Sequence, residues 1–101
     1  MYMSSSYTED YKKIIVQIIR THMPNAKIIL YGSRARHDDK AGSDIDIALD
    51  AGAPINERSI NNIMHDLEES QLPIYFDIVD FHRVSKEMQQ DILREGVVWQ
   101  K

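Results

Sequence analysis

The segment GSRARHDDKAGSDID, residues 32–46, constrains the fold and the chemistry of this 101-residue chain more than any other. It follows an apolar run that predicts a buried strand ending at Gly32. A Gly-Ser turn at such a strand end exposes backbone N–H groups, a hydroxyl and a helix N-terminus to an anion. After Ser33 and ten further residues, Asp44 and Asp46 stand on a second predicted strand, pointing to one face about 7 Å apart. The segment therefore predicts a phosphate site beside a divalent-cation site, as chemistry on a nucleoside triphosphate requires.

Hydrophobic periodicity predicts alternating helices and strands around this segment. Two apolar stripes at helical spacing are each followed by a proline, which ends the helix. We expect helices from residue 7 or 8 to about 22, over 33–37, from about 56 or 59 up to Pro73, and over 85–95. We expect strands at 27–31, 43–49 and 74–80. Three strands alternating with helices predict a small sheet with helices packed against it, in one domain spanning residues 1–101.

A third aspartate, Asp77, lies in the middle of the apolar strand IYFDIVD. An unpaired buried carboxylate costs several kcal/mol, so this position requires a solvent-exposed face or a bound cation. If this strand lies beside the one that carries Asp44 and Asp46, three carboxylates form one patch, whose repulsion a divalent ion would relieve. Asp80 competes for the same role, but it has the opposite strand parity and ends the strand. The sequence therefore favours Asp77.

The predicted patch has the donor set of a magnesium site. Ligands that are all oxygen favour Mg²⁺ or Mn²⁺ over zinc. Two such ions about 4 Å apart would hold a triphosphate and align an attacking oxygen with its α-phosphorus. We expect Asp46 to bridge the ions and Asp77 to lie nearest the nucleophile, where it could help to remove the proton. Arg34 either contacts phosphate oxygens or is solvated, and for Arg36 we favour a solvated position.

Composition narrows the class of protein. The formal net charge of −4 argues against broad electrostatic binding to nucleic acid, which needs a basic face. The chain has no cysteine, no apolar run long enough for a membrane span and no signal-like N-terminus, so we expect a cytoplasmic protein. The four histidines show no metal-ligand spacing. We expect Tyr75 and Trp99 to complete the core rather than to contact a partner.

The spacing GSx10DxD with a later strand aspartate resembles the polymerase-beta-like nucleotidyltransferase superfamily, and the small size narrows this to the minimal nucleotidyltransferases. The similarity covers the leading helix, IILYGSRARHDDKAGSDIDIAL, YFDIVD and ILREGVVW. It implies an α+β fold of two layers, in which helices flank a small mixed β-sheet. It also implies ATP as substrate, Gly32 and Ser33 as nucleotide-binding residues, and Asp44, Asp46 and Asp77 as metal ligands and catalytic residues. We add Arg34 to the nucleotide-binding residues because it flanks the motif.

The same resemblance implies a partner. Many minimal nucleotidyltransferases are encoded beside a HEPN-domain toxin and transfer AMP from ATP to one of its tyrosines, which silences it. The resemblance therefore implies a Mg²⁺-dependent antitoxin, in a hetero-oligomer with the product of an adjacent gene. An antitoxin that acts by binding alone and an enzyme that modifies a small molecule remain as alternatives. His37 stands where the family commonly has glycine, which implies a somewhat different loop.

Overall fold

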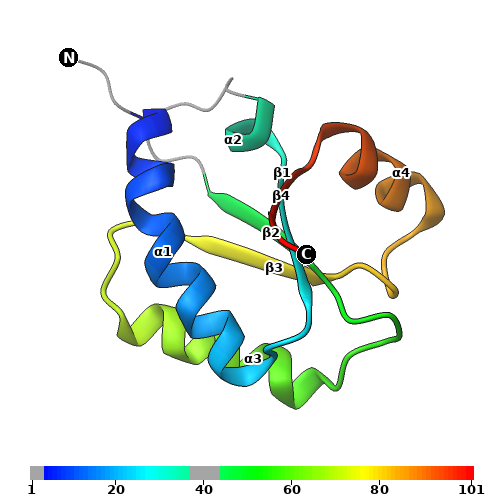
Figure 1. Ribbon diagram of the computed structural model, residues 1–101, viewed down its shortest axis with the longest axis horizontal. Coiled ribbons are helices and arrows are strands. Elements are labelled where there is room, and N and C mark those ends of the chain that lie inside the picture. Colours follow the sequence, from blue (N-terminus) through cyan, green and yellow to red (C-terminus); the bar gives the residue numbers. More distant parts are fainter. Residues whose placement is uncertain (1–3, 37–43) are drawn as a thin grey trace.

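Helices and strands alternate along the chain, and the computed structural model describes residues 4–36 and 44–101 (Figure 1). The helices are α1 (Ser4–His22), α2 (Ser33–Arg36), α3 (Glu57–Glu69) and α4 (Lys86–Glu95). The strands are β1 (Lys27–Tyr31), β2 (Ile45–Asp50), β3 (Phe76–Asp80) and β4 (Val97–Gln100). The expected α+β class is confirmed.

The strands form one mixed sheet in the order β3-β2-β1-β4. β1 pairs antiparallel with both β2 and β4, whereas β2 and β3 are parallel. Parallel neighbours need a crossover connection, and α3 supplies it between β2 and β3. Our expectation of three strands was wrong, because the short run VVWQ after Gly96 pairs with the open edge of β1.

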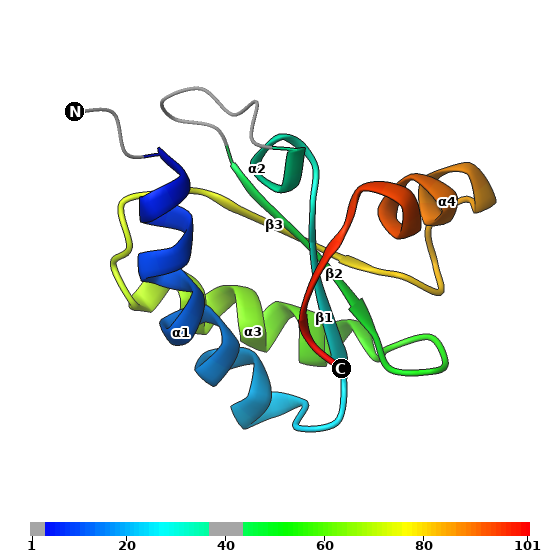
Figure 2. The ribbon, with the colours of Figure 1, turned by 45° about the horizontal axis from the view of Figure 1, so that its top comes forward.

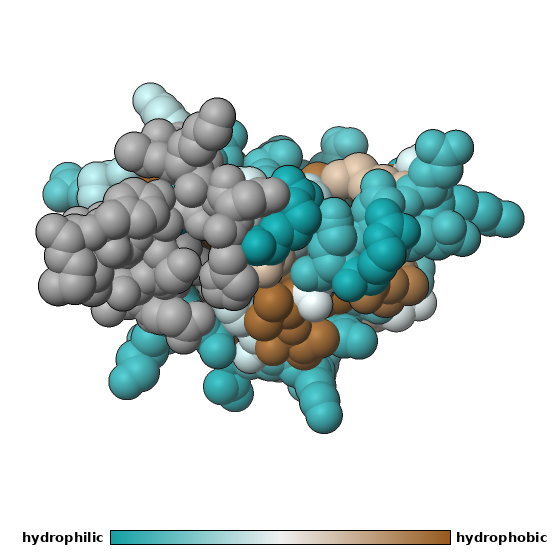
Figure 3. Space-filling model, turned by 90° about the horizontal axis from the view of Figure 1, so that it is seen from above, coloured by the Kyte–Doolittle hydropathy of each residue, from teal (hydrophilic) through white to brown (hydrophobic). Residues whose placement is uncertain are grey.

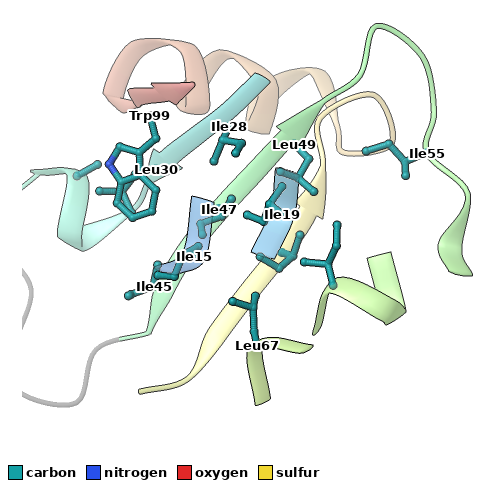
Figure 4. Close-up of a cluster of buried hydrophobic side chains, with 13 residues drawn as sticks. Ile15, Ile19, Ile28, Leu30, Ile45, Ile47, Leu49, Ile55, Leu67 and Trp99 are labelled. Atoms are coloured by element: carbon teal, nitrogen blue, oxygen red, sulfur yellow. The ribbon is translucent and has the colours of Figure 1, made fainter. Parts of the chain in front are cut away.

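α1 and α3 form a helical layer on one face of the sheet (Figure 2). The side chains that meet between this layer and the sheet include most of the largest fully buried ones, and each stabilises the fold by about 1.5–3 kcal/mol. Figure 4 shows this core, which includes Ile15, Ile19, Ile28, Ile45, Ile47, Leu49, Leu67 and Trp99. Residues of even and odd number on β2 therefore face different environments, since Ile45, Ile47 and Leu49 belong to this core.

α4 packs on the opposite face of the sheet and covers only part of it. Its buried Ile92 contacts a small cluster with Ile29 and Ala48, against which Val79 also packs. Gly96 ends the helix, and its N–H donates to the Ile92 carbonyl at 2.8 Å. The rest of this face extends beyond α4 toward the Gly-Ser turn.

Side-chain caps fix where two helices begin. Asn56 accepts the Arg58 N–H at the start of α3, and Ser85 accepts the Met88 N–H at the start of α4. α1 starts at Ser4, earlier than the predicted start at residue 7 or 8. In the part of the chain that the structure describes, none of these helices has the length and apolarity to cross a membrane.

The two aromatic residues that we expected in the core have different environments. Trp99 is 9% exposed and belongs to the main core, as predicted. Tyr75 is 78% exposed, so the prediction for it was wrong. It precedes β3, and its carbonyl accepts the Ile45 N–H at 2.9 Å while its ring faces solvent.

Gly96→Ala tests the close packing of α4 on β1. A Cβ atom at Gly96 would lie 2.4 Å from the Ile92 carbonyl oxygen and 2.5 Å from Ile29 Cγ2. We expect this overpacking to lower the free energy of unfolding by about 1–3 kcal/mol in urea denaturation. Gly52→Asn is the control, because Gly52 has φ +82° and open space, and asparagine tolerates this conformation. Equal losses in the two variants would contradict the packing argument.

Candidate active site

A polar row crosses the sheet at the end that α4 leaves open. Tyr31 pairs with Asp46 across β1 and β2, and Asp46 pairs with Asp77 across β2 and β3. Paired residues on neighbouring strands point to the same face, so these three side chains lie side by side. The adjacent row on this face is apolar and contains the cluster under α4. The structure therefore brings two of the three predicted aspartates together directly.

Asp46 is the half-buried centre of the row, and its surroundings disfavour its charge. Burial, followed by repulsion from Asp77 and Asp44, raises its pKa from the usual 3.8 to about 6. Arg36 and Arg34 oppose this increase without cancelling it. The two arginines therefore do not fully neutralise the negative charge around Asp46.

Tyr31 closes the other end of the row. Burial raises the pKa of its hydroxyl, and the charges of Asp46 and Asp77 raise it further, so the phenol is neutral at physiological pH. The sequence analysis did not identify this residue. Its parity on β1 is visible in the sequence, but the β1–β2 register that sets it opposite Asp46 is not.

The Gly-Ser turn lies directly against the carboxylate of Asp46. Gly32 has φ +76°, and a Cβ atom there would lie 2.4 Å from Asp46 Oδ2. Only glycine fits both the left-handed backbone and this close approach. The Arg36 N–H bonds the Gly32 carbonyl at 3.1 Å as the first hydrogen bond of α2, so Ser33 starts the helical turn. N–H groups in a first turn have no intrahelical acceptor and are available to an anion.

Asp44 and Asp77 are both exposed, and Asp44 lies immediately before β2. Asp44 is near enough to Asp46 to raise its pKa. Within residues 4–36 and 44–101, no three His, Cys, Asp or Glu side chains converge as a ready-made metal site. The fit of a cation rests instead on donor chemistry, because all three groups supply oxygen and their repulsion is relieved by positive charge. These residues could hold Mg²⁺ or Mn²⁺.

The two arginines after the turn have different environments. Arg34 is 6% exposed and lies near enough to Asp46 to lower its pKa, so it is not the solvated residue of our alternative. Arg36 is exposed, as expected, and its Nη1 donates to Glu95 Oε1 at 3.0 Å and to Oε2 at 3.1 Å. This ion pair links α2 to the last turn of α4, next to the site.

Asp80 and Asp50, the other acidic residues of β3 and β2, have structural partners. Asp80 is buried, and its carboxylate accepts the N–H of Ile55 at 2.6 Å and that of His82 at 3.0 Å. Asp50 contacts the His82 ring at 2.6 Å and accepts the Gly52 N–H at 2.9 Å. The Asp80 carboxylate thus stabilises the segments around Ile55 and His82, while Asp77 remains exposed. The predicted loop residues 38–42 and their neighbours His37 and Ser43 lie outside the described residues.

Figure 3 shows the molecule from above, with mostly hydrophilic side chains at its described surface and a hydrophobic patch near the centre of the view. Leu93, Val97 and Val98 of α4 and β4 are among the exposed large hydrophobic residues.

Comparison with known proteins identifies relatives of the same fold. A family model described as polymerase beta, nucleotidyltransferase matches residues 12–100. The probable protein adenylyltransferase MntA of Haemophilus influenzae is 26% identical over 88 residues, which are 87% of this chain and 77% of that protein.

Two solved structures extend this comparison. A toxin–antitoxin crystal structure with AMP-PNP aligns with a TM-score of 0.75 and 25% identity, over 87% of this chain and 71% of that chain. A tri-AMPylated Shewanella oneidensis HEPN toxin in complex with an MNT antitoxin gives a TM-score of 0.71 at 22% identity, over 91% and 71% of the two chains. The second likeness is one of fold.

The raised pKa of Asp46 predicts a pH-dependent gain in stability on replacing it with asparagine. The folded pKa lies above the unfolded one, so folded wild type binds this proton more tightly and loses stability as the pH rises from about 4 to about 6. In urea denaturation with EDTA, we expect Asp46→Asn to be about 1 kcal/mol more stable than wild type at pH 7.5, after solvent screening is allowed for. At pH 4.5 the difference should shrink. A difference that is unchanged between the two pH values would contradict the burial and repulsion described for Asp46.

Proposed function

Because the chain belongs to the polymerase beta nucleotidyltransferase family, we propose that it transfers AMP from ATP to a tyrosine of a HEPN-domain toxin and acts as that toxin's antitoxin. The observation that carries this proposal is the pairing of Asp46 with Asp77, directly against the Gly32 turn. The backbone that we propose to bind phosphate and the carboxylates that we propose to bind a cation therefore lie at one end of the sheet.

The relatives support the choice of acceptor. The Haemophilus protein is described as a probable protein adenylyltransferase, and the structural neighbour at 25% identity is a toxin–antitoxin with AMP-PNP. We extend the activity of the first relative and the assembly of the second to this chain. ATP is then the donor, and a HEPN toxin is the partner in a hetero-oligomer. A cytoplasmic location follows from this role, because both substrates occur there.

The chain's own residues divide the work of the transfer. N–H groups of the turn at Gly32 and Ser33 bind triphosphate oxygens, and Arg34 stabilises the negative charge around the row. The acceptor tyrosine oxygen attacks the α-phosphorus, a new O–P bond forms, and the bond to pyrophosphate breaks. Asp77, exposed at the end of the row, accepts the proton of the tyrosine hydroxyl.

Asp44, Asp46 and Asp77 are the proposed ligands of Mg²⁺. When bound, the metal supplies charge neutralisation at the triphosphate and at the developing oxyanion. The elevated pKa of Asp46 supports this assignment, because a carboxyl that is hard to ionise alone becomes easy to ionise beside a cation.

Labelling of the toxin tests the proposal. The protein is incubated with α-labelled ATP, Mg²⁺ and the HEPN product of the adjacent gene, and label on the toxin is measured. We expect Asp44→Asn and Asp46→Asn each to lower labelling at least about 100-fold, because each removes a metal ligand. Asp50→Asn is the matched control, since Asp50 lies on the same face of β2, four residues from Asp46, and should retain labelling.

Each of the other possible outcomes contradicts one part of the proposed function. Labelling that persists in both variants would show that the metal assignment is wrong. A wild-type protein that binds and inhibits the toxin without labelling it would show that the antitoxin acts by binding alone. Label on a small molecule and none on the toxin would replace the protein acceptor.

Gly32→Ala tests the contact between the turn and Asp46. The new Cβ would displace the Asp46 carboxylate, and a misplacement of about 1 Å in a reacting site costs roughly 100-fold in rate. Gly52→Ala is the matched control, because Gly52 has a similar φ of +82° with nothing within 4 Å. We expect Gly52→Ala to lose stability from its backbone and to keep its rate of labelling. A similar loss of rate in both variants would rule out a specific role for the contact.

A further inference from the structure

A groove of about 750 Å³ lies between α1 and β4, on the face of the sheet opposite the Asp46 row. Its floor and walls combine Val16, Pro24 and Trp99 with polar residues of α1. Trp99 packs with the α1 core, whereas Tyr31 and Ala48 belong with the α4 side. The groove is therefore separate from the candidate active site.

The groove is basic in a chain whose net charge is −4. Lys12, Lys13 and Arg20 line it, and among the side chains that the structure describes no carboxylate does. Lys12 Nζ lies 5.9 Å from the centre of the Trp99 ring, and none of these three cations has an ion pair within the described part of the chain. Other cations of the chain, outside the groove, such as Arg36 and Arg83, do contact carboxylates. Positive charge is thus concentrated here without a partner.

Helical spacing sets the pattern of this charge. Lys12, Val16 and Arg20 occur at i, i+4 and i+8, so they form one row along α1. Eight residues of helix separate the two ends by about 12 Å, with an apolar side chain between them. In an extended segment, about four residues span the same distance.

Two features of Trp99 favour an occupant that is itself a polypeptide. Trp99 lies on β4, which within the described residues is an edge strand with one unpaired backbone edge, and added strands bind to such edges. Its indole N–H is buried and has no acceptor among the described residues. Buried donors without acceptors are rare, and an oxygen of a bound segment can accept this N–H once the side chains that cover it shift.

We propose that the groove between α1 and β4 docks an extended acidic segment of a partner protein. Acidic side chains about four residues apart pair with Lys12 and Lys13 at one end and Arg20 at the other, and an apolar side chain between them packs on Val16 and Trp99. Three cations on an acidic protein are too few for a nucleic-acid surface, which needs a broad basic face. Nucleotidyl transfer is not required for this docking, so the two proposals fail independently.

The single tryptophan provides the test, because Trp99 is itself part of the groove. The full chain is titrated, without ATP or metal, with the blocked hexapeptide EELVEE and with its uncharged counterpart QQLVQQ, while Trp99 fluorescence is measured. We expect EELVEE to change the fluorescence saturably and QQLVQQ to bind at least about tenfold more weakly. Binding of EELVEE should weaken at 1 M salt, where the Debye length is about 3 Å.

Charge variants locate the binding site. We expect Lys12→Gln/Lys13→Gln/Arg20→Gln to weaken EELVEE binding at least about tenfold, and Arg58→Gln/Lys86→Gln, on exposed positions of α3 and α4, to leave it within about twofold. Circular dichroism checks that both variants fold. No saturable change with EELVEE, or equal effects of the two variants, would overturn the proposal. Tighter binding of a single-stranded oligothymidylate than of EELVEE would replace the acidic segment with a nucleic acid.

Discussion

The repulsion among Asp46, Asp77 and Asp44 is the interaction on which the architecture of this end of the molecule depends. Parallel pairing of β2 and β3 sets Asp46 beside Asp77, and the left-handed Gly32 turn leaves room for the Asp46 carboxylate. A fold optimised for stability alone would place apolar or neutral side chains in such a row. Its cost is tolerated because Asp77 stays exposed and because the raised pKa of Asp46 lets it take a proton when no cation is bound.

The same face of the sheet shows how this cost is confined. Two residues after Asp46 on β2, Ala48 pairs with Ile29 of β1 in an apolar row, and Ile92 of α4 covers both side chains. Two residues further on, Asp50 is held by His82 and the Gly52 N–H. Along this face of β2, the Asp46 carboxylate, which is repelled by its neighbours, is therefore followed by the buried methyl group of Ala48. The Asp50 carboxylate comes next, and it has hydrogen-bond partners. Only the first of these positions has spare capacity for a ligand.

The sequence predicted the parts of this site that depend on parity and local turns. Asp46 and Asp77 could be assigned to one patch only on the condition that their strands are neighbours, and the structure meets this condition by pairing β2 with β3. Tyr31 could not be assigned, because the β1–β2 register is set by tertiary packing across a long connection rather than by a tight turn. β4 was missed since four residues are too few for periodicity, and Tyr75 was misplaced because an aromatic residue next to a strand need not enter the core.

The distribution of charge over the two faces has a consequence for partners. Carboxylates concentrate at the open end of the α4 face, while Lys12, Lys13 and Arg20 concentrate in the groove on the α1 side. An anionic segment near the Asp46 row would meet repulsion, and the same segment at the groove would meet attraction. An acidic partner therefore cannot approach the two regions equally. In the proposed docking, this difference in charge directs an acidic segment to the groove and away from the row that we propose for the triphosphate and the acceptor side chain.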